Sequence, residues 1–437
     1  MESFEEWVKG EYRYAAGAML RSVSPIDLVK SRPGFGHEIR AVRGAIVASP
    51  VLASWDPDPD YFFHWYRDSA VVIDVLGLLF ENGTIGAEAL THVADFVRFT
   101  LGLRKVDGRE LVTRASWRSN VAAEFLKYLR TEAELTACHG ELIAADTRVN
   151  PDGTLDISKW CRPQHDGPPL RALALLRWTQ RAKFDADVAA DIAELIRADV
   201  DFTRAHWREP SFDIWEEETG QHFYTLCVSA AALLTGADWL DARGQRDEAR
   251  ACRAEGETVR RKLEEFWLPE EGYVRSRLPV SGVRSTKELD ISVVLAAIHA
   301  GGVLGEQLTH DPRILATLER LESLFDAAYP INRGRPSGRG PAMGRYAGDA
   351  YFSGGAWYIA TLGAAELCFR AAVGRKDANA WVEKGDAFLA TVRAFTPPGG
   401  ELSEQFDQRT GAQTSAKHLA WSYAAFISCV TARPGAR

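Results

Sequence analysis

Two adjacent carboxylates, Glu216 and Glu217, directly follow Trp215 in the segment 211–223. A carboxylic acid that donates a proton near neutral pH needs a raised pKa, and both an apolar aromatic neighbour and a second negative charge raise it. Adjacent glutamates are also common on solvated helix faces, so the pair needs support from elsewhere in the chain. Proton donation is the chemistry that this arrangement indicates.

Three further segments place aromatic and charged residues side by side, each just before an expected helix. Arginine and aspartate beside an aromatic platform can hold sugar hydroxyls. A second carboxylate in a polar loop supplies the other group that glycosidic bond cleavage needs, because it activates water or attacks the anomeric carbon. Taken singly, each charge also fits an ion pair or a first-turn carboxylate at a helix start. The segments are 61–70 with Trp65, Arg67 and Asp68, 159–172 with Trp160, Arg162, Gln164 and Asp166, and 399–411 with Glu404 and Gln405.

Helical periodicity extends over almost the whole chain. Apolar residues recur on one helix face from Val188 to Ile196, and Asp311 with Pro312 is a helix-start signal before another such run. No alternating run of β-branched residues predicts a sheet. We therefore expect an all-α fold with about a dozen helices or slightly more. The other helical stretches lie near 3–22, 67–81, 85–103, 120–135, 171–183, 226–243, 246–267, 288–300, 354–373, 376–396 and 415–431.

Long non-helical segments separate many of these helices. Alternating short and long loops suit an α-toroid, in which the long loops gather at one end around a cleft. The stretch 332–345 is dense in glycine and arginine, and is either a solvated loop or a rim over an active site. No low-complexity linker divides the chain, so we expect one domain over 1–437. The other long segments are 31–66, 104–119, 138–170 and 207–224.

Composition excludes several classes of function. The net charge of −8 argues against nucleic acid, which binds through excess lysine and arginine. No apolar run approaches the length of a transmembrane helix, and the first residues lack a signal-peptide pattern, so we expect a cytoplasmic protein without a membrane partner. The six cysteines and ten histidines form no CxxC or HExxH pattern. We expect free thiols, no metal and no cofactor.

Five segments, in chain order, resemble the glucoamylase family, glycoside hydrolase family 15, in its compact catalytic form without a starch-binding module. The resemblance spans almost the whole chain, and several of its motifs exceed ten residues. It implies an (α/α)6 barrel (toroid) with the active site in a pocket formed by long loops at one end. The segments are GAIVASP and DPDYFFHWYRDSA within 44–70, WCRPQHDGPPLRA at 160–172, FDIWEEETGQHFYT at 212–225, GRYAGDAYFSGGAW at 344–357 and LSEQFDQRTGAQTSAKHLAWSYAAF at 402–426.

The resemblance also implies roles for particular residues. Glu216 is expected to be the general acid and Glu404 the general base that activates water, while Glu217 holds a substrate hydroxyl. The implied reaction is a single displacement with inversion that releases β-glucose, with the two carboxyl groups about 6.5–9.5 Å apart. The residues expected to bind substrate are Tyr61, Trp65, Arg67, Asp68, Trp160, Arg162, Trp215, Glu217, Arg345, Tyr351, Trp357 and Gln405.

This chain departs from the family pattern at two places on the expected rim, namely 347–349 and 353–356, where a carboxylate and two amides are missing. We therefore expect an inverting exo-acting α-glucosidase whose linkage, α-1,4, α-1,6 or that of trehalose, stays open. Its substrate would be a small α-glucoside or soluble oligosaccharide, and the protein a monomer or homodimer. The alternatives are a trehalase, an inverting phosphorylase that uses the arginines of 332–345 for phosphate, a transglycosylase, or a non-catalytic glycan-binding protein.

Overall fold

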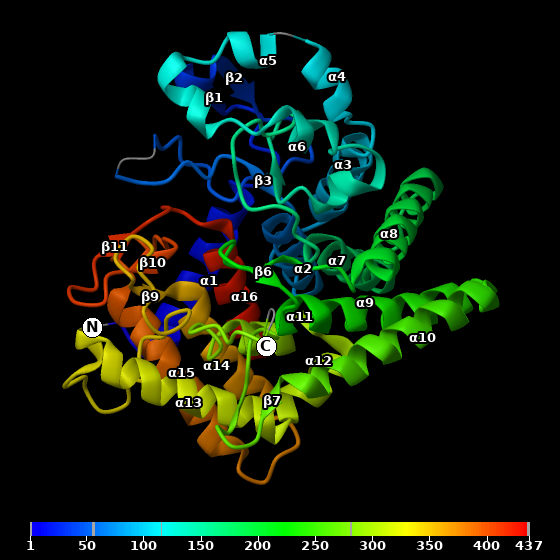
Figure 1. The fold of residues 1–437 in the computed structure, drawn as a ribbon. Coiled ribbons are helices and arrows are strands. Elements are labelled where there is room, and N and C mark those ends of the chain that lie inside the picture. Colours follow the sequence, from blue (N-terminus) through cyan, green and yellow to red (C-terminus); the bar gives the residue numbers. More distant parts are fainter. Residues whose placement is uncertain (1, 55–56, 115, 280–281, 435–437) are drawn as a thin grey trace.

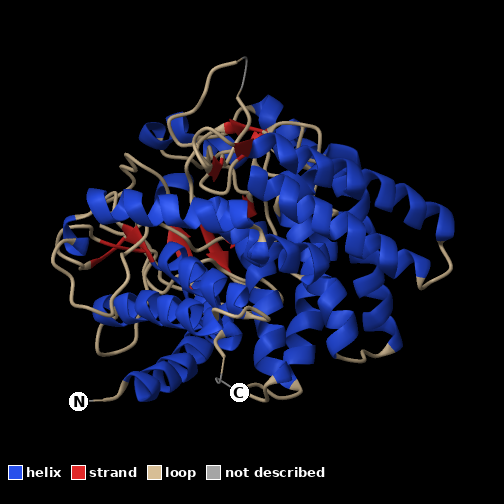
Figure 2. Ribbon diagram, turned by 90° about the horizontal axis from the view of Figure 1, so that it is seen from below, coloured by secondary structure: helices blue, strands red, loops and turns tan. Residues whose placement is uncertain are grey.

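The computed structural model describes residues 2–54, 57–114, 116–279 and 282–434. Helices dominate these residues, and the strands are only two to four residues long (Figures 1 and 2). The α-helices are α1 (Phe4–Leu20), α2 (Tyr66–Glu81), α3 (Glu88–Leu103), α4 (Gly108–Thr113), α5 (Ser116–Ser119), α6 (Glu132–Thr136), α7 (Gly167–Arg181), α8 (Ala186–His206), α9 (Phe223–Asp241), α10 (Arg246–Lys262), α11 (Ser292–Ala300), α12 (Gly302–His310), α13 (Pro312–Ala328), α14 (Tyr358–Ala372), α15 (Ala378–Phe395) and α16 (Ala420–Ala432).

Six of these helices form a closed inner ring. In the order α2, α7, α9, α11, α14 and α16, each packs against the next, and α16 returns to α2. Nearly every residue of α14 is buried, as expected for a helix with neighbours on all sides. The ring explains why the chain supplies several helices that are apolar all round rather than along one stripe.

An outer layer covers this ring. Helix α1 packs on α16, α3 on α2, α8 on α7, α10 on α9, α12 and α13 on α11, and α15 on α14. Helix α10 shows the outer pattern, because it buries Ala249, Cys252, Gly256 and Val259 along one stripe and carries charged residues elsewhere. Six outer–inner pairs around a closed ring make the (α/α)6 barrel that the sequence predicted.

Helix α9 corrects one expectation from the sequence. It is 19 residues long and apolar enough to cross a membrane by length and composition, so an apolar run of that length does exist. In the structure 78% of the apolar window is buried inside the barrel. An inner barrel helix and a membrane span have the same composition because both are surrounded by apolar groups.

Short strand pairs fix the loops that lead into the inner helices. Trp65 pairs with Arg148 between β3 and β4, and Gln405 pairs with Trp357 between β10 and β9. The strands are β1 (Val29–Arg32), β2 (His37–Arg40), β3 (His64–Trp65), β4 (Arg148–Val149), β5 (Ser211–Phe212), β6 (Thr219–Gly220), β7 (Trp267–Leu268), β8 (Tyr273–Val274), β9 (Ala356–Trp357), β10 (Gln405–Phe406) and β11 (Gln413–Thr414). Such short strands leave no alternating pattern, and for this reason the sequence showed none.

The helix predicted near 120–135 is wrong. This region holds a 3-10 helix, η2 (Ala123–Tyr128), and the single turn α6. Neither packs into the ring, and η2 buries none of its residues fully. This region lies above β3 in Figure 1, together with the hairpin β1–β2 and the short helices α4 and α5. The helical periodicity of this stretch therefore corresponds to two short helical turns and not to a helix of the barrel.

Close packing between α14 and α15 depends on a glycine. A Cβ added at Gly385 of α15 would lie 2.4 Å from the ring of Phe369 in α14, whose side chain is fully buried. We expect Gly385→Ala to destabilise the fold by about 1–3 kcal/mol, because neither partner has room to move. Gly17 of α1 is a matched control, since nothing lies within 4 Å of its added Cβ.

Gly17→Ala should stabilise by about 0.5–1 kcal/mol through the lower conformational freedom of the unfolded chain. Thermal unfolding of the two variants measures both effects. A shift of the unfolding midpoint in the same direction for both would contradict the packing argument.

Candidate active site

The loops that enter the inner helices at their N-terminal ends meet around a cavity of about 220 Å3. Residues from 48–68 lead into and begin α2, residues 160 and 161 precede α7, and residues 214–217 precede α9. Residues 345–357 precede α14, and residues 404–421 lead into α16. The expected arrangement, in which aromatic and charged segments stand just before helices and converge at one end of a toroid, is therefore what the barrel contains.

All the predicted site residues except Arg162 and Gln405 line this cavity. Both carboxylates assigned to catalysis, Glu216 and Glu404, are among them. The lining residues that the sequence had indicated are Tyr61, Trp65, Arg67, Asp68, Trp160, Trp215, Glu216, Glu217, Arg345, Tyr351, Trp357 and Glu404.

The carboxylate of Glu216 is held by three nitrogen donors. Its Oε1 accepts from the indole Nε1 of Trp65 at 2.9 Å and from Nη2 of Arg67 at 2.8 Å, and its Oε2 accepts from Nε1 of Trp160. Two rings and a guanidinium therefore fix its position and direct it into the cavity. The aromatic neighbour that the sequence indicated, Trp215, is not one of these donors, and the rings that bond this carboxylate come from two other loops.

A left-handed backbone conformation presents Glu216. Its φ of 64° is uncommon for a residue other than glycine. The carboxylate of Asp213 anchors this turn, since it accepts from the backbone N–H groups of Trp215, Glu217 and Glu218 at 2.9–3.2 Å. Asp213 is buried and has no role in the sequence prediction, yet it sets the direction of the Glu216 side chain.

Arg67 is a buried cation at the start of α2. Its Nη1 donates to Gln164 at 3.1 Å and to Asp166 at 3.0 Å, and its Nη2 donates to Glu216. Asp68 lies next to it, 3.9 Å away. Burial raises the pKa of Asp68, and the charges of Glu216 and Asp166 act in the same direction while Arg67 opposes them. The resulting pKa is about 7. The site thus gathers several carboxylates around one guanidinium.

Glu404 lies in a second group of donors. Its Oε1 accepts from the hydroxyl of Tyr61 at 3.1 Å, and its Oε2 accepts from the hydroxyl of Ser415. The hydroxyl of Tyr61 also lies 2.8 Å from that of Tyr351. Burial raises the pKa of Glu404 to about 7, while Ser415, Arg345 and Tyr61 act in the opposite direction. A carboxylate with a pKa near the working pH is well suited to exchange a proton with water.

Glu217 faces a different set of partners from its neighbour. Its carboxylate accepts from Lys287 at 2.6 Å, from Arg345 at 2.9 Å and from the hydroxyl of Tyr346. Burial raises the pKa of Glu217, but the cations outweigh burial and the pKa lies below its usual value. Arg345 is held in turn by Asp349 through two bonds of 2.6 and 2.7 Å. Glu217 is therefore an ionised group at the wall of the cavity.

Two predicted residues lie outside the cavity lining. Arg162 forms ion pairs with Asp146 and Asp156, which place its guanidinium away from the cavity. Gln405 is fully buried in β10, and its side-chain atoms have no partner in the part of the chain that the structure describes. Both positions follow residues that do line the site, and sequence alone does not show which side of the backbone each side chain takes.

Sequence reasoning also missed residues that hold the predicted ones. Ser415 and Lys287 carry no pattern that marks them, because their role comes from contacts across 11 and 70 residues. Trp421 lines the cavity from the first turn of α16, and its indole Nε1 has no partner among the described residues. Trp421 lies within the motif 402–426, but the sequence assigned it no role.

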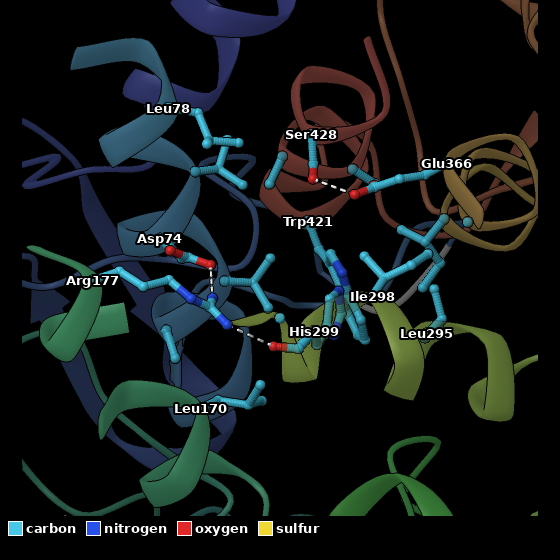
Figure 3. A pocket seen from close by; sticks show the side chains of 18 of the residues that line it. Asp74, Leu78, Leu170, Arg177, Leu295, Ile298, His299, Glu366, Trp421 and Ser428 are labelled. Carbon is cyan, nitrogen blue, oxygen red and sulfur yellow. Dashed lines mark hydrogen bonds and ion pairs between the residues drawn. The ribbon is translucent and has the colours of Figure 1, made fainter. Parts of the chain in front are cut away.

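Trp421 also separates this cavity from a second one, of about 180 Å3, inside the barrel (Figure 3). Arg177 is bound there to Asp74, and Glu366 accepts from Ser428 at 2.8 Å. His299, beside Trp421, has its pKa lowered to about 3 by burial and is neutral. The charges that line this second cavity are paired with one another, since Arg181 also binds Asp74 and Arg370 binds Glu366.

The glycine- and arginine-rich loop 332–345 contributes only its last residue to the cavity. Arg335 binds Asp326, Arg339 lies over the ring of Phe395, and Gly340 donates to the backbone of Ala387 at 2.8 Å. The loop therefore packs on the outer helices instead of forming a rim. Among the described residues no three histidine, cysteine or acidic side chains are grouped to hold a metal ion.

Burial of Glu404 has a consequence for stability. The pKa of Glu404 rises from 4.5 to about 7 on folding, so the folded state binds the proton of this carboxyl group more tightly than the unfolded state. The stability that this proton binding contributes is fully present below pH 4.5 and is lost as the pH rises through 7. Glu404→Gln should thus be more stable than the unaltered protein by up to about 3 kcal/mol at pH 8, and equal to it at pH 4.

Unfolding midpoints measured from pH 4 to pH 8 test this expectation. Glu110→Gln, at an exposed glutamate of α4, is the control and should show no such trend. A difference between Glu404→Gln and the unaltered protein that did not grow with pH would contradict the burial argument.

Comparisons with known proteins agree with this geometry. Residues 145–431, well over half of the chain, match the model of the family described as glycosyl hydrolases family 15. Glucoamylase 1 of Rhizopus oryzae is 28% identical, over 99% of this chain and 72% of its own length. The probable glucoamylase of Schizosaccharomyces pombe is 29% identical, over 99% and 92%.

Solved structures give the same result. The family 15 glucoamylase of Hypocrea jecorina has a TM-score of 0.80 and 25% identity, and the match covers 99% of this chain and 73% of that one. The likeness therefore extends over the whole barrel. The chain belongs to glycosyl hydrolases family 15 and is a glycoside hydrolase of the glucoamylase type, as its motifs had indicated.

Proposed function

We propose that this enzyme removes single glucose units from the non-reducing ends of soluble α-linked oligosaccharides, with inversion at the anomeric carbon. The observation that carries this proposal is the placement of Glu216 and Glu404. They come from loops before different inner helices, line one cavity, and are held by separate donors. Paired carboxyl groups on opposite sides of a bond are the groups that inversion requires.

The two carboxylates are held apart by neighbouring rings. Glu404 bonds the hydroxyl of Tyr61, and Glu216 bonds the indole of Trp65, whose ring centre lies 5.0 Å from that of Tyr61. Neither carboxylate bonds the other. Inversion needs roughly 6.5–9.5 Å between the two carboxyl groups, so that a water molecule fits between base and sugar. Membership in glycosyl hydrolases family 15 supports this mechanism.

The size of the cavity favours exo action. At about 220 Å3 it is smaller than the roughly 300–1,000 Å3 of pockets that enclose drug-sized ligands, and suits little more than one sugar ring. Trp421 lines both this cavity and the second one, so its ring stands between them. A chain end that enters would therefore meet the ring of Trp421 at the inner end.

The proton path follows from the partners of each group. Arg67 and Asp68 would hold hydroxyls of the terminal glucose, and Glu216 would protonate the glycosidic oxygen. Glu404 would take a proton from water, which it can do once ionised, at a pH above about 7. Arg345, over the ring of Trp357 at 4.7 Å, stiffens the far wall. The location of the enzyme in the cytoplasm and its action as a monomer stay predictions.

The anomer of the first product tests the proposal directly. With maltose, isomaltose, trehalose and longer maltodextrins as substrates, NMR of the early reaction should show β-glucose from at least one of them, because water attacks from the face opposite the leaving group. Initial α-glucose would contradict inversion. No glucose from any member of the panel would contradict the hydrolase proposal itself.

Acid and base can be told apart by the leaving group. Glu216→Gln and Glu404→Gln should each lower kcat on oligosaccharides by about 10²–10⁴-fold. Glucosyl fluoride needs no protonation when fluoride departs, so Glu216→Gln should keep most of its activity on α-glucosyl fluoride and Glu404→Gln should not. The reverse pattern would exchange the two roles, and the exposed variant Glu110→Gln should behave as the unaltered enzyme on both substrates.

A further inference from the structure

A third cavity, of about 490 Å3, lies on the other side of Trp160 from the active site. It is formed by the hairpin β1–β2, the 3-10 helix η2 and the segment 156–160, all in the part of the chain that lies above β3 in Figure 1. Its volume falls within the roughly 300–1,000 Å3 of typical ligand pockets. None of the residues that sequence patterns assigned to the site, apart from Trp160, lines it.

Aromatic rings make up much of its wall. Phe35 and Phe125 meet edge to face at 5.4 Å, and Tyr128 lies 6.0 Å from Phe125. A Cβ added at Gly34 would lie 2.5 Å from the ring of Phe125, so the hairpin holds this ring firmly. Tyr128 leaves half of its surface exposed. These rings form a preformed platform of the kind that binds the C–H faces of sugars.

Polar side chains complete the lining. Arg148 is fully buried, and its Nε and Nη2 donate to Asp156 at 2.9 Å and Ser158 at 3.2 Å. Asp156 and Ser158 line the cavity, as does Lys159, which is exposed. A hydroxyl and an ammonium group beside aromatic rings can bond the hydroxyls of a sugar.

The cavity shares a wall with the catalytic acid. Trp160 lines both cavities, and its Nε1 bonds Glu216. The guanidinium of Arg148 lies 3.7 Å from the centre of the Trp160 ring and 4.7 Å from that of Trp65. Both rings that bond Glu216 therefore contact Arg148. The acid protonates the leaving group, so this cavity lies on the side from which the rest of a glucan chain departs.

We propose that this cavity is a second carbohydrate site, which takes hexose rings of an α-glucan chain against Tyr128 and Phe125 with hydroxyls at Ser158 and Lys159. The proposal rests on the proposed function. The same sugar chemistry has two sources, either remote units of the chain whose end is in the active site or a second oligosaccharide. Tyr128→Ala separates these sources and is safe for the fold, because the side chain is half exposed.

Kinetics on a series from maltose to maltoheptaose form the first arm of the test. If one chain spans both cavities, Tyr128→Ala lowers the ratio of kcat/KM for maltoheptaose to that for maltose by about two- to tenfold, the effect of losing one aromatic contact. Leu126→Ala, at an exposed residue of the same 3-10 helix that does not line the cavity, is the matched control and leaves the ratio unchanged.

Calorimetric titration of maltoheptaose into the Glu404→Gln protein forms the second arm. The same titration is made with Tyr128→Ala added to Glu404→Gln. Loss of a second bound molecule per protein shows a separate oligosaccharide, whereas weaker binding of a single molecule shows a spanning chain. The proposal is overturned if Tyr128→Ala changes neither the kinetic ratio, the stoichiometry nor the affinity. Failure of the unaltered enzyme to release glucose would instead overturn the proposed function, and the titration would still decide the cavity.

Discussion

The buried guanidinium of Arg67 is the constraint around which the site is built. A charge removed from water must be compensated, and this one is compensated by Asp68, Asp166 and Glu216, which belong to three different segments of the chain. Burial, with the charge of Glu216, raises the pKa of Asp68 and of Asp166 against the effect of Arg67, and the pKa of Asp68 reaches about 7. Within this cluster Asp68 is therefore partly protonated near neutral pH. A sugar ring, which offers several hydroxyl donors and carries no charge, is a ligand that such a cluster can bind without a further ionic penalty.

Closure of the helix ring is what brings these groups together. Arg67 opens α2, Asp166 directly precedes α7 and Glu216 lies before α9, and these inner helices pack side by side. Glu404 enters from the opposite arc, where β10 pairs with β9 at Trp357 before α14 and α16. Glu216 and Glu404 stand before helices on opposite sides of the ring. Their separation is therefore set by the diameter of the ring rather than by a local loop. A reaction that needs room for water between two carboxylates fits this scaffold better than a single loop would.

How far the sequence predicts this structure depends on whether a feature is local. Helical repeats such as Val188 to Ile196 and the Asp311–Pro312 start predicted their helices, because one face and one cap decide them. The stretch 120–135 was misassigned because no barrel neighbour exists to stabilise a helix there. Motifs located most of the lining, yet they placed Arg162 in the site, since adjacency to Trp160 does not reveal the side chain's direction. Ser415 and Lys287 were missed because only the fold brings them to the carboxylates they hold. Asp213 was missed because its bonds go to backbone groups of its own turn, which no residue pattern marks.

The adjacent glutamates show the same limit of prediction from sequence within one short segment. Sequence suggests that Glu216 and Glu217 act on each other's charge, whereas the structure sends them to different walls. The positive φ of Glu216, which costs roughly 1–2 kcal/mol for a residue with a Cβ, redirects the chain between them, and Asp213 holds that turn through three backbone donors. Lys287 and Arg345 then neutralise Glu217, so its charge acts on these cations more than on its neighbour. The strained turn thus gives two identical side chains different partners, with Glu216 held by Arg67 and two indoles and Glu217 by two cations and a phenol.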